Sequence, residues 1–312
     1  MRRLKRGDGA VLEVAFVNNM PDAALSATEA QFARLVRAGA AGRAVRWRCY
    51  ALPGLDRSEK ARRYLARSHE AIEALYRRGA DAVIVTGSEP RAERLEREPY
   101  WPHIQRLVDW AREHTRAAIW SCLAAHAATL HLSGIERRPE TRKMSGVLQF
   151  TNYAPEWSGE RAGTRIVPHS RCNGLDRDAL ERYGFQIGSN SDVAGVDMFW
   201  RREPSLFVFL QGHPEYDADT LAKEYRRDVL RFLDGAQSTY PAQPERVFDA
   251  ALSARLDELT ARIRCGCVAD ANRTLESLLA GQSYGAPWKE DAIALYRDWL
   301  STVDALRKAR QD

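Results

Sequence analysis

Short apolar runs alternate with segments of helical periodicity in the first part of the chain. Ala10–Val17 (AVLEVAFV) and Asp81–Thr86 (DAVIVT) are continuous apolar runs, which are typical of buried strands. In Pro102–His114 the apolar residues recur mostly at the spacing of one helix face. The pattern predicts strands at Ala10–Val17, Val45–Leu52, Asp81–Thr86 and Ala117–Trp120, and helices at Ala24–Arg37, Ser58–Arg78, Pro102–His114 and Leu123–Leu132.

This alternation predicts an α/β fold, with a mostly parallel sheet and helices on both of its faces. From Gly146 to Gln211 the pattern changes to short strands separated by turns. We interpret this region as a mixed edge of the same sheet, with loops that frame a site. Its expected strands are Gly146–Phe150, Thr164–Val167, Phe185–Gly188, Val196–Trp200 and Ser205–Leu210.

The remaining chain has the periodicity of helices. Asp217–Leu233 is expected to be a helix, with Asp217 or Asp219 as its N-cap. The stretch Tyr240-Pro241-Ala242-Gln243-Pro244 marks a domain boundary. We therefore expect an α/β domain over residues 1–240 and a C-terminal helical extension over residues 241–312. The helices expected in this extension are Arg246–Arg264, Ala271–Leu279 and Pro287–Arg310.

Composition narrows the classes of partner. The chain has 312 residues, of which 45% are hydrophobic and 29% charged, and its net charge is +5. The arginines are dispersed over expected helices, so we interpret them as a solvated surface and expect no binding of nucleic acid. Such a surface would also suit an anionic substrate such as an acyl-coenzyme A. The apolar runs are too short to span a membrane, and the basic start Met1–Arg6 lacks the apolar core of a secretory signal.

The cysteines indicate a reducing compartment. The chain has five of them, an odd and irregularly spaced set, which favours the cytoplasm over a disulfide-bonded secreted protein. Cys265-Gly266-Cys267 has no second cluster of ligands, so we expect no zinc there and no metal elsewhere.

Cys122 is the candidate nucleophile. It lies where the strand Ala117–Trp120 runs into the helix Leu123–Leu132. Free N–H groups at a helix N-terminus favour a thiolate and can hold an oxyanion. A lone thiol is more often a buried structural residue, but the order strand, Ser121, Cys122, helix resembles a nucleophile elbow that lacks the usual flanking glycines.

His213 is the candidate base. It follows the apolar strand Ser205–Leu210 and therefore lies at the edge of an open α/β sheet where ligands collect. Residues two apart in an extended segment share a side, so Glu215 can orient His213. Because Cys122 lies at the same edge, these three residues form a candidate triad for covalent acyl chemistry.

Other polar residues give weaker signals. His126 is a competing base, but it would point along its helix, so we expect it to pack there. Lys143 and Arg227, as single charges, are solvated surface residues by default. Pro168-His169-Ser170-Arg171 places hydroxyl, imidazole and guanidinium donors at the end of a predicted strand, which suits recognition of a carboxylate or an amino-acid head group.

Taken together, these motifs resemble the homoserine O-acyltransferases of the homoserine O-succinyltransferase family. The resemblance spans residues 10–235, and its motifs occur in the order that the family has. The matching stretches are Asn19-Met20-Pro21, Val85-Thr86-Gly87, Tyr100-Trp101-Pro102, the Cys122 segment, Lys143 with Ser145-Gly146-Val147, Pro168–Arg171, Gly212–Asp217 and Arg227-Asp228-Val229.

The resemblance implies a fold like that of the class I glutamine amidotransferases, a cytoplasmic homodimer and a ping-pong reaction. Cys122 would accept the acyl group, His213 would act as general base and Glu215 would orient His213. The acyl group would come from acyl-coenzyme A, a co-substrate and not a bound cofactor. It would then pass to the hydroxyl of L-homoserine, in methionine biosynthesis.

The resemblance also implies which residues contact the substrates. An oxyanion hole would be formed by the backbone N–H of Leu123 and by one near Gly87 or Ser88. Arg227 matches the position that binds the carboxylate of the amino acid. The residues expected to bind substrate are Lys143, Ser170, Arg171 and Arg227.

Arg91 departs from the family pattern. It lies in the loop that separates acetyl from succinyl users, at a position where the family usually has Gly or Glu. An arginine can pair with the distal carboxylate of a succinyl group, so it favours succinyl-coenzyme A over acetyl-coenzyme A.

Three alternatives stay open. The chain can be a related acyltransferase with another acceptor, such as serine. A glutaminase-type amidotransferase is disfavoured because Ser121-Cys122-Leu123-Ala124 is not a Gly-x-Cys-x-Gly elbow. A non-catalytic ligand-binding relative is disfavoured by the complete set of Cys122, His213 and Glu215.

Overall fold

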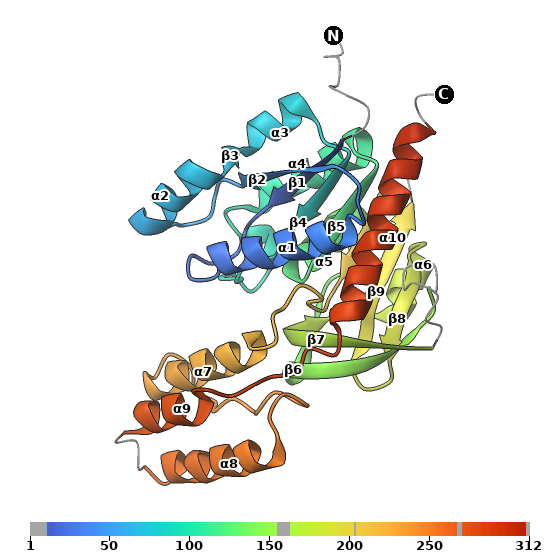
Figure 1. Ribbon diagram of the computed structural model, residues 1–312. Coiled ribbons are helices and arrows are strands. Elements are labelled where there is room, and N and C mark those ends of the chain that lie inside the picture. Colours follow the sequence, from blue (N-terminus) through green and yellow to red (C-terminus); the bar gives the residue numbers. More distant parts are fainter. Residues whose placement is uncertain (1–10, 155–162, 203, 267–269, 310–312) are drawn as a thin grey trace.

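The computed structural model describes residues 11–154, 163–202, 204–266 and 270–309 (Figure 1). Cys267 of the Cys265-Gly266-Cys267 stretch lies outside these residues. Within them, a ten-stranded sheet has the order β3-β2-β1-β4-β5-β10-β9-β8-β6-β7. The strands are β1 (Leu12–Val17), β2 (Val45–Ala51), β3 (Glu70–Ala71), β4 (Ala82–Val85), β5 (Ala117–Ser121), β6 (Arg138–Asn152), β7 (Gly163–Gly174), β8 (Gln186–Ser191), β9 (Gly195–Arg202) and β10 (Leu206–Leu210).

The sheet has a parallel part and an antiparallel part. From β3 to β10 the neighbouring strands are parallel, and from β10 to β7 they are antiparallel. The central strands β4, β5 and β10 are buried at every residue, as expected for parallel strands that are covered on both faces. The α/β fold with a mostly parallel sheet, predicted from the apolar runs, is confirmed.

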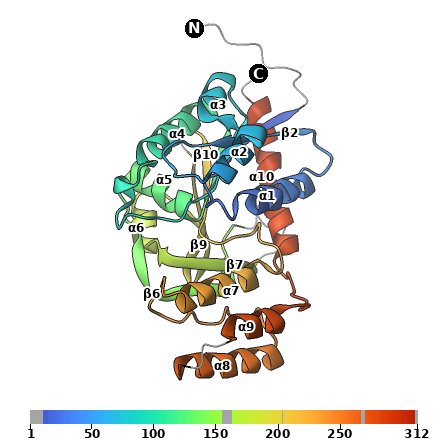
Figure 2. The ribbon, with the colours of Figure 1, turned by 90° about the vertical axis from the view of Figure 1, so that its left-hand side faces the viewer.

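Helices cover both faces of the sheet (Figure 2). Successive residues of β4 show the division, because Val83 and Val85 pack into one core and Ile84 packs into the other. The first core contains residues of α3 (Ile72–Arg78), α4 (Trp101–His114) and α5 (Leu123–Ser133). The second contains residues of α1 (Leu25–Gly39) and α10 (Lys289–Lys308).

One expected helix is broken. The single helix predicted over Ser58–Arg78 is instead α2 (Glu59–Ser68), the short strand β3 and then α3. His69 is extended, with φ −123° and ψ 147°, and the next residue, Glu70, pairs with Tyr50 of β2. Ala61 is the buried residue of α2, whereas α3 buries Ile72 and Leu75. The break thus adds a strand to the sheet edge and lets the apolar part of the segment turn into the core.

The antiparallel strands are longer than predicted. β6 and β7 form a long hairpin, so His169 and Arg171 lie within a strand and not at its end. Two arginines of β7 are buried, with Arg165 at 3% and Arg171 at 5% exposure. Because these residues interrupt the apolar pattern, the pattern predicted a shorter strand. The 3-10 helix η1 (Leu95–Arg97) and the helix α6 (Arg177–Arg182) connect other strands of the sheet.

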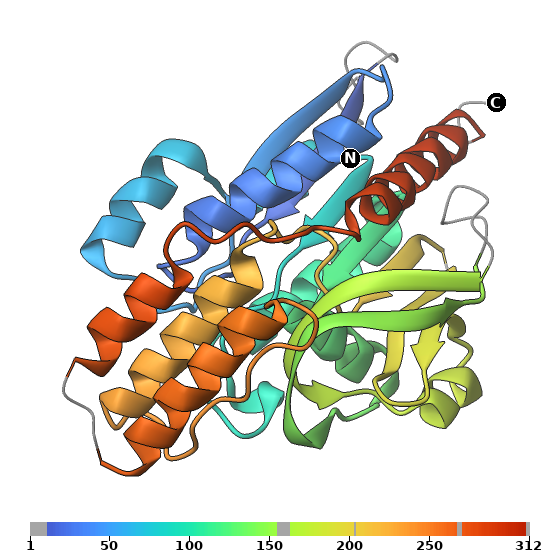
Figure 3. The same ribbon diagram turned by 60° about the horizontal axis from the view of Figure 1, so that its bottom comes forward.

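The helices after the sheet separate into two groups. α7 (Thr220–Leu233), α8 (Ala250–Arg264) and α9 (Ala271–Leu279) share a small core of their own and lie side by side (Figure 3). α10 leaves this group and packs beside α1 on the sheet. Among the helices that the structure describes, none combines the length and apolar character needed to cross a bilayer.

Candidate active site

Cys122 lies on a sharp turn between β5 and α5. Its backbone has φ 53° and ψ −118°, a conformation that L-residues rarely adopt. Ser121 pairs with Leu210 of the neighbouring strand β10, and the Cys122 N–H donates to the Leu210 carbonyl over 2.7 Å. The thiol is therefore held at the carboxyl-terminal edge of the sheet, next to the segment that carries His213.

Gly87 follows β4 and lies against the start of α5. A Cβ atom at this position would be 2.8 Å from the Leu123 N and 2.7 Å from the Leu123 Cβ, closer than such contacts allow. Only glycine therefore permits the loop to approach the helix. The approach brings two of the predicted oxyanion-hole residues, Gly87 and Leu123, together beside Cys122. Ser88 comes next in the chain, and its hydroxyl oxygen is buried without a hydrogen-bond partner in the described part of the structure.

His213 and Glu215 form a buried pair. His213 Nδ1 lies 2.8 Å from Glu215 Oε1, and the two residues are 6% and 3% exposed. The His213 N–H donates to the Pro168 carbonyl of β7 over 2.8 Å. Tyr216 stacks on the imidazole, with 4.2 Å between the ring centroids and 14° between the planes. The role of Tyr216 in holding the ring was missed by the sequence analysis, because nothing in the pattern marks a stacking partner.

Electrostatics favour a charged imidazole at this site. Burial opposes a positive charge on His213, but interactions with Cys122 and Glu215, including hydrogen bonds to both side chains, outweigh it and raise the pKa well above its ordinary value. The described geometry thus places thiol, imidazole and carboxylate in one chain of contacts. A positively charged imidazole in this position can stabilise a thiolate on the neighbouring cysteine.

His126 occupies a different environment. Its Nε2 is 2.8 Å from the amide oxygen of Gln211, and burial lowers its pKa to about 4. The ring is therefore neutral at physiological pH and is used in a contact between α5 and the segment after β10. The structure thus brings His213, and not His126, into the interaction with Cys122.

Lys143 and Arg227 meet at a buried carboxylate that the sequence analysis did not single out. Lys143 Nζ lies 2.6 Å from one oxygen of Asp228, and Arg227 Nε donates to the other over 2.8 Å. Asp228 is 6% exposed. Burial alone would raise its pKa, but Lys143 and Arg227 hold the pKa below its usual range. Arg227 Nη1 also lies 3.9 Å from Glu224 Oε1, so two carboxylates match the two cations.

Arg171 is placed differently from Arg227. Its side chain is 3% exposed, and Nη1 donates to Glu140 Oε1 over 2.6 Å and to the Asn173 carbonyl over 2.7 Å. Nη2 donates to the Ala194 carbonyl. The guanidinium is therefore engaged with β6 and β7 and with the turn before β9. Ser170 lies one residue earlier in β7, opposite Ser145 of β6.

Arg91 lies on the wall of a cavity of about 470 Å³. Its Nη1 lies 2.5 Å from Asp56 Oδ2, and both side chains are exposed. Its backbone N–H donates to Glu98 Oε1 over 2.6 Å, which fixes the loop after β4. The cavity is lined by residues 19, 21–23, 54–57, 88–91 and 98–100.

The start of α10 is attached to the loop that carries the candidate base. The indole Nε1 of Trp288 donates to the Tyr216 carbonyl over 3.2 Å, and Lys289 Nζ lies 3.4 Å from Asp217 Oδ1. Near the other end of the helix, Arg307 donates to the carbonyl of Val11, just before β1. The helix therefore joins the first strand to the segment that holds His213.

Comparisons with known proteins identify the family of the chain. Residues 2–306 match the family model described as homoserine O-succinyltransferase. The chain is 45% identical over 299 residues to a homoserine O-succinyltransferase of Rhodopseudomonas palustris, covering 94% of this chain and 88% of the relative. It is 44% identical over 294 residues to one of Methylorubrum extorquens, covering 94% and 87%.

A solved structure shows the same fold. The glutamine amido transferase from Methylobacillus flagellatus has a TM-score of 0.51 and 13% identity, and the match covers 94% of this chain and 95% of that one. At this identity the likeness concerns the fold, which agrees with the predicted amidotransferase-like architecture. The resemblance found in the sequence motifs is confirmed by the family model and by the relatives. The chain therefore belongs to the homoserine O-succinyltransferase family.

Proposed function

We propose that this protein transfers a succinyl group from succinyl-coenzyme A to the hydroxyl of L-homoserine through a thioester on Cys122. The observation that carries the proposal is the contact chain from Cys122 to His213 to Glu215, at the sheet edge where Gly87 approaches Leu123. The names of the relatives support the succinyl donor and the homoserine acceptor.

In the first half-reaction, the Cys122 thiolate attacks the carbonyl carbon of the acyl thioester. The N–H groups of Leu123 and of Gly87 or Ser88 would hold the oxyanion that forms. The carbon–sulfur bond to coenzyme A then breaks, and the departing thiolate takes the proton of His213. The acyl group remains on Cys122, and His213 is left neutral.

In the second half-reaction, neutral His213 takes the proton of the homoserine hydroxyl as that oxygen attacks the Cys122 thioester. Glu215 holds Nδ1, so Nε2 is the nitrogen available to exchange protons. Collapse of the intermediate releases the O-acyl amino acid and restores the thiolate–imidazolium pair. Stacking by Tyr216 keeps the ring in one orientation through both steps.

The flanking charges fit the two substrates. Arg227, whose side chain is 46% exposed, would donate to the carboxylate of homoserine and give up part of its contact with Asp228 or Glu224. The cavity beside Ser88 would take the acyl donor, and the distal carboxylate of a succinyl group would compete with Asp56 for Arg91. Cys49, Cys122, Cys172 and Cys265 are free thiols, which supports a reducing, cytoplasmic location.

Mass spectrometry of the intact protein tests the proposal. Brief incubation with succinyl-coenzyme A, without acceptor, should add one succinyl group to the wild type and to Cys172→Ala, but none to Cys122→Ala. Cys172 is exposed and therefore serves as the matched control. Added homoserine should discharge the adduct faster than serine does.

Three results would count against the proposal. An adduct only with acetyl-coenzyme A would reject the succinyl donor, and faster discharge by serine would reject homoserine. A succinyl adduct that persists in Cys122→Ala would reject the nucleophile.

A further inference from the structure

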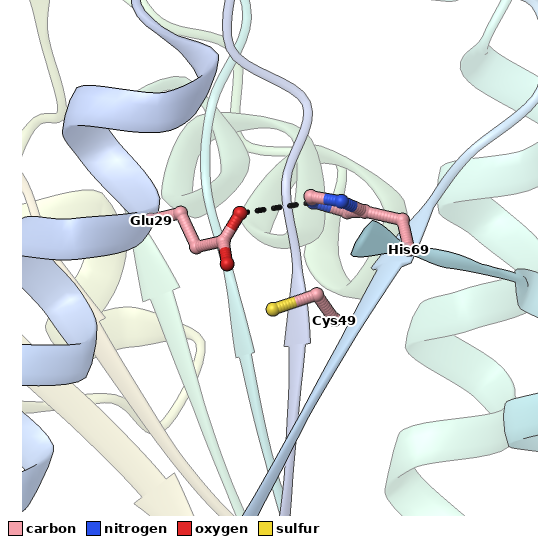
Figure 4. Close-up of side chains that lie close together, drawn as sticks. All are labelled: Glu29, Cys49 and His69. Atoms are coloured by element: carbon pink, nitrogen blue, oxygen red, sulfur yellow. Dashed lines mark ion pairs between the residues drawn. The ribbon is translucent and has the colours of Figure 1, made fainter. Parts of the chain in front are cut away.

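A second group of cysteine, histidine and glutamate side chains lies away from the active site (Figure 4). Glu29 belongs to α1, Cys49 to β2, and His69 to the junction of α2 and β3. One ligand atom of each lies within 4.8 Å of the others. β1 and β4 separate β2 from β5 in the sheet, so this group is distinct from the Cys122 site.

The Ser68 hydroxyl lies against the Nδ1 side of the His69 ring. Ser68 Oγ lies 2.9 Å from the Tyr64 carbonyl and 2.9 Å from His69 Nδ1, and when it donates its proton to the carbonyl it accepts from Nδ1. A neutral imidazole then carries its lone pair on Nε2. This nitrogen belongs to a side chain that is 1% exposed, and it has no hydrogen-bond partner in the described structure.

The lone pair of Nε2 faces another electron-rich atom. Glu29 Oε2 lies 3.9 Å away, as the dashed line in Figure 4 marks, and it already accepts a hydrogen bond from the Tyr64 hydroxyl over 2.6 Å. The Cys49 sulfur completes the triangle from a residue that is 7% exposed. The Cys49 thiol hydrogen-bonds to the Glu29 carboxylate, so a proton lies between these two groups, and a metal ion bound by all three side chains would replace it. The nearby cation Arg57 donates through Nη1 to the Met20 carbonyl and to Asp22, and its buried Nη2 has no hydrogen-bond partner among the described residues.

We propose that Glu29, Cys49 and His69 form a zinc site. Thiolate, imidazole and carboxylate are the ligands that Zn²⁺ takes in proteins. The thiolate and the carboxylate would balance the two charges of the ion, with the Cys49 proton released to solvent. Bond lengths of about 2.0–2.3 Å place tetrahedral ligand atoms about 3.6 Å apart, so the group must contract by about 1 Å. The Glu29 side chain, 24% exposed at a helix surface, has room for this movement.

Such a site would explain how α2 is held. This helix is strongly polar, and Ala61 is the residue that it buries, so apolar packing anchors it weakly. His69 follows its last turn, whereas Glu29 and Cys49 lie on elements of the second core. An ion bound by all three would fasten the end of α2 to α1 and β2. Ser68 would hold the histidine tautomer, as hydrogen-bond partners of zinc-bound histidines do.

Zinc titration of the full-length, chelator-treated protein tests this proposal. We expect one Zn²⁺ per chain, with affinity lowered at least about 100-fold in Cys49→Ala and in His69→Ala. Glu29→Gln keeps the shape of a partly exposed side chain and should also weaken binding. Cys122→Ala and Cys172→Ala are the thiol controls and should bind as the wild type does. Cobalt added in place of zinc should give a thiolate charge-transfer band that Cys49→Ala abolishes.

Thermal unfolding separates binding from folding. Zn²⁺ should raise the unfolding midpoint temperature of the wild type by mass action and leave that of Cys49→Ala unchanged. The circular dichroism spectra of the two metal-free proteins should be the same, which shows that the variant is folded. Equal zinc affinity of the wild type, Cys49→Ala and Glu29→Gln would overturn the site. Loss of the cobalt band in Cys122→Ala instead would place the metal at the other thiol and would also overturn it.

Discussion

The backbone of Cys122 stores strain that a pair of substitutions should reveal. With φ 53° and ψ −118°, the residue has a conformation that glycine adopts readily and L-residues do not. Cys122→Gly and Cys122→Ala both remove the thiol and differ only in the Cβ atom. A comparison of these two variants therefore isolates the strain from the loss of sulfur.

The expected difference follows from two opposing terms. A backbone held in a sparsely populated region costs about 1–3 kcal/mol, and glycine removes this cost. Glycine also makes the unfolded chain more flexible, which lowers stability by about 0.4–1 kcal/mol. Cys122→Gly should therefore be more stable than Cys122→Ala by about 1–2 kcal/mol, although neither variant forms an acyl adduct.

Urea unfolding followed by far-UV circular dichroism measures this difference, provided that the two variants have equal m-values. Ala127→Gly, in the middle of α5, is the control for an ordinary helical position and should destabilise by about 1 kcal/mol or more. If Cys122→Gly were instead as unstable as Cys122→Ala, or less stable, the strain at the nucleophile would be refuted.

Three further outcomes are expected. Burial lowers the pKa of His126 to about 4, whereas the unfolded chain binds a proton near pH 6.5, so stability should fall as the pH falls between these values. Urea unfolding should show a loss of about 2 kcal/mol from this group between pH 7 and pH 5, and equal slopes in the wild type and His126→Gln would contradict it. Arg227→Ala should raise the KM for homoserine about 10–100-fold, which corresponds to the loss of a hydrogen bond to a charged group, and should change the KM for succinyl-coenzyme A little. Steady-state kinetics measure both values, and equal rises would exclude a contact with the homoserine carboxylate. Trp288→Phe removes the hydrogen bond to the Tyr216 carbonyl and should lower the transfer rate about 5-fold. The control Trp299→Phe removes a buried indole N–H of α10 that has no partner in the described structure, and it should leave the rate unchanged. Equal rates in the two variants would show that the Trp288 hydrogen bond does not position the loop.

The sequence was sufficient to predict the centre of the fold, and it placed the residues of the candidate triad at one edge of the sheet. Continuous apolar runs marked the parallel strands, and the carboxyl ends of neighbouring parallel strands share one edge. That rule placed Cys122 and His213 together although 91 residues separate them (213 − 122). The family model and the relatives confirm the resemblance on which the substrates were expected.

Other features depend on contacts that have no sequence signature. Asp228 reads as one more charge on a polar helix, and only the fold shows that it is buried beneath two cations. Glu29, Cys49 and His69 are each 20 residues from the next, a spacing without meaning until α1, β2 and the end of α2 are packed together. The break at His69 was hidden because the segment around it is helical in composition.

The attachment of α10 has a consequence for how the chain folds. Arg307 reaches the Val11 carbonyl across 296 positions, while Trp288 reaches the loop of the base across 72. Contacts between such distant positions form late in folding, because closing a long loop costs entropy before the contacts stabilise the chain. A refolding chain should therefore regain most of its helical circular dichroism signal before Trp288 bonds to the loop that carries His213. Catalytic competence would then return with the slowest kinetic phase and not with the bulk of the secondary structure.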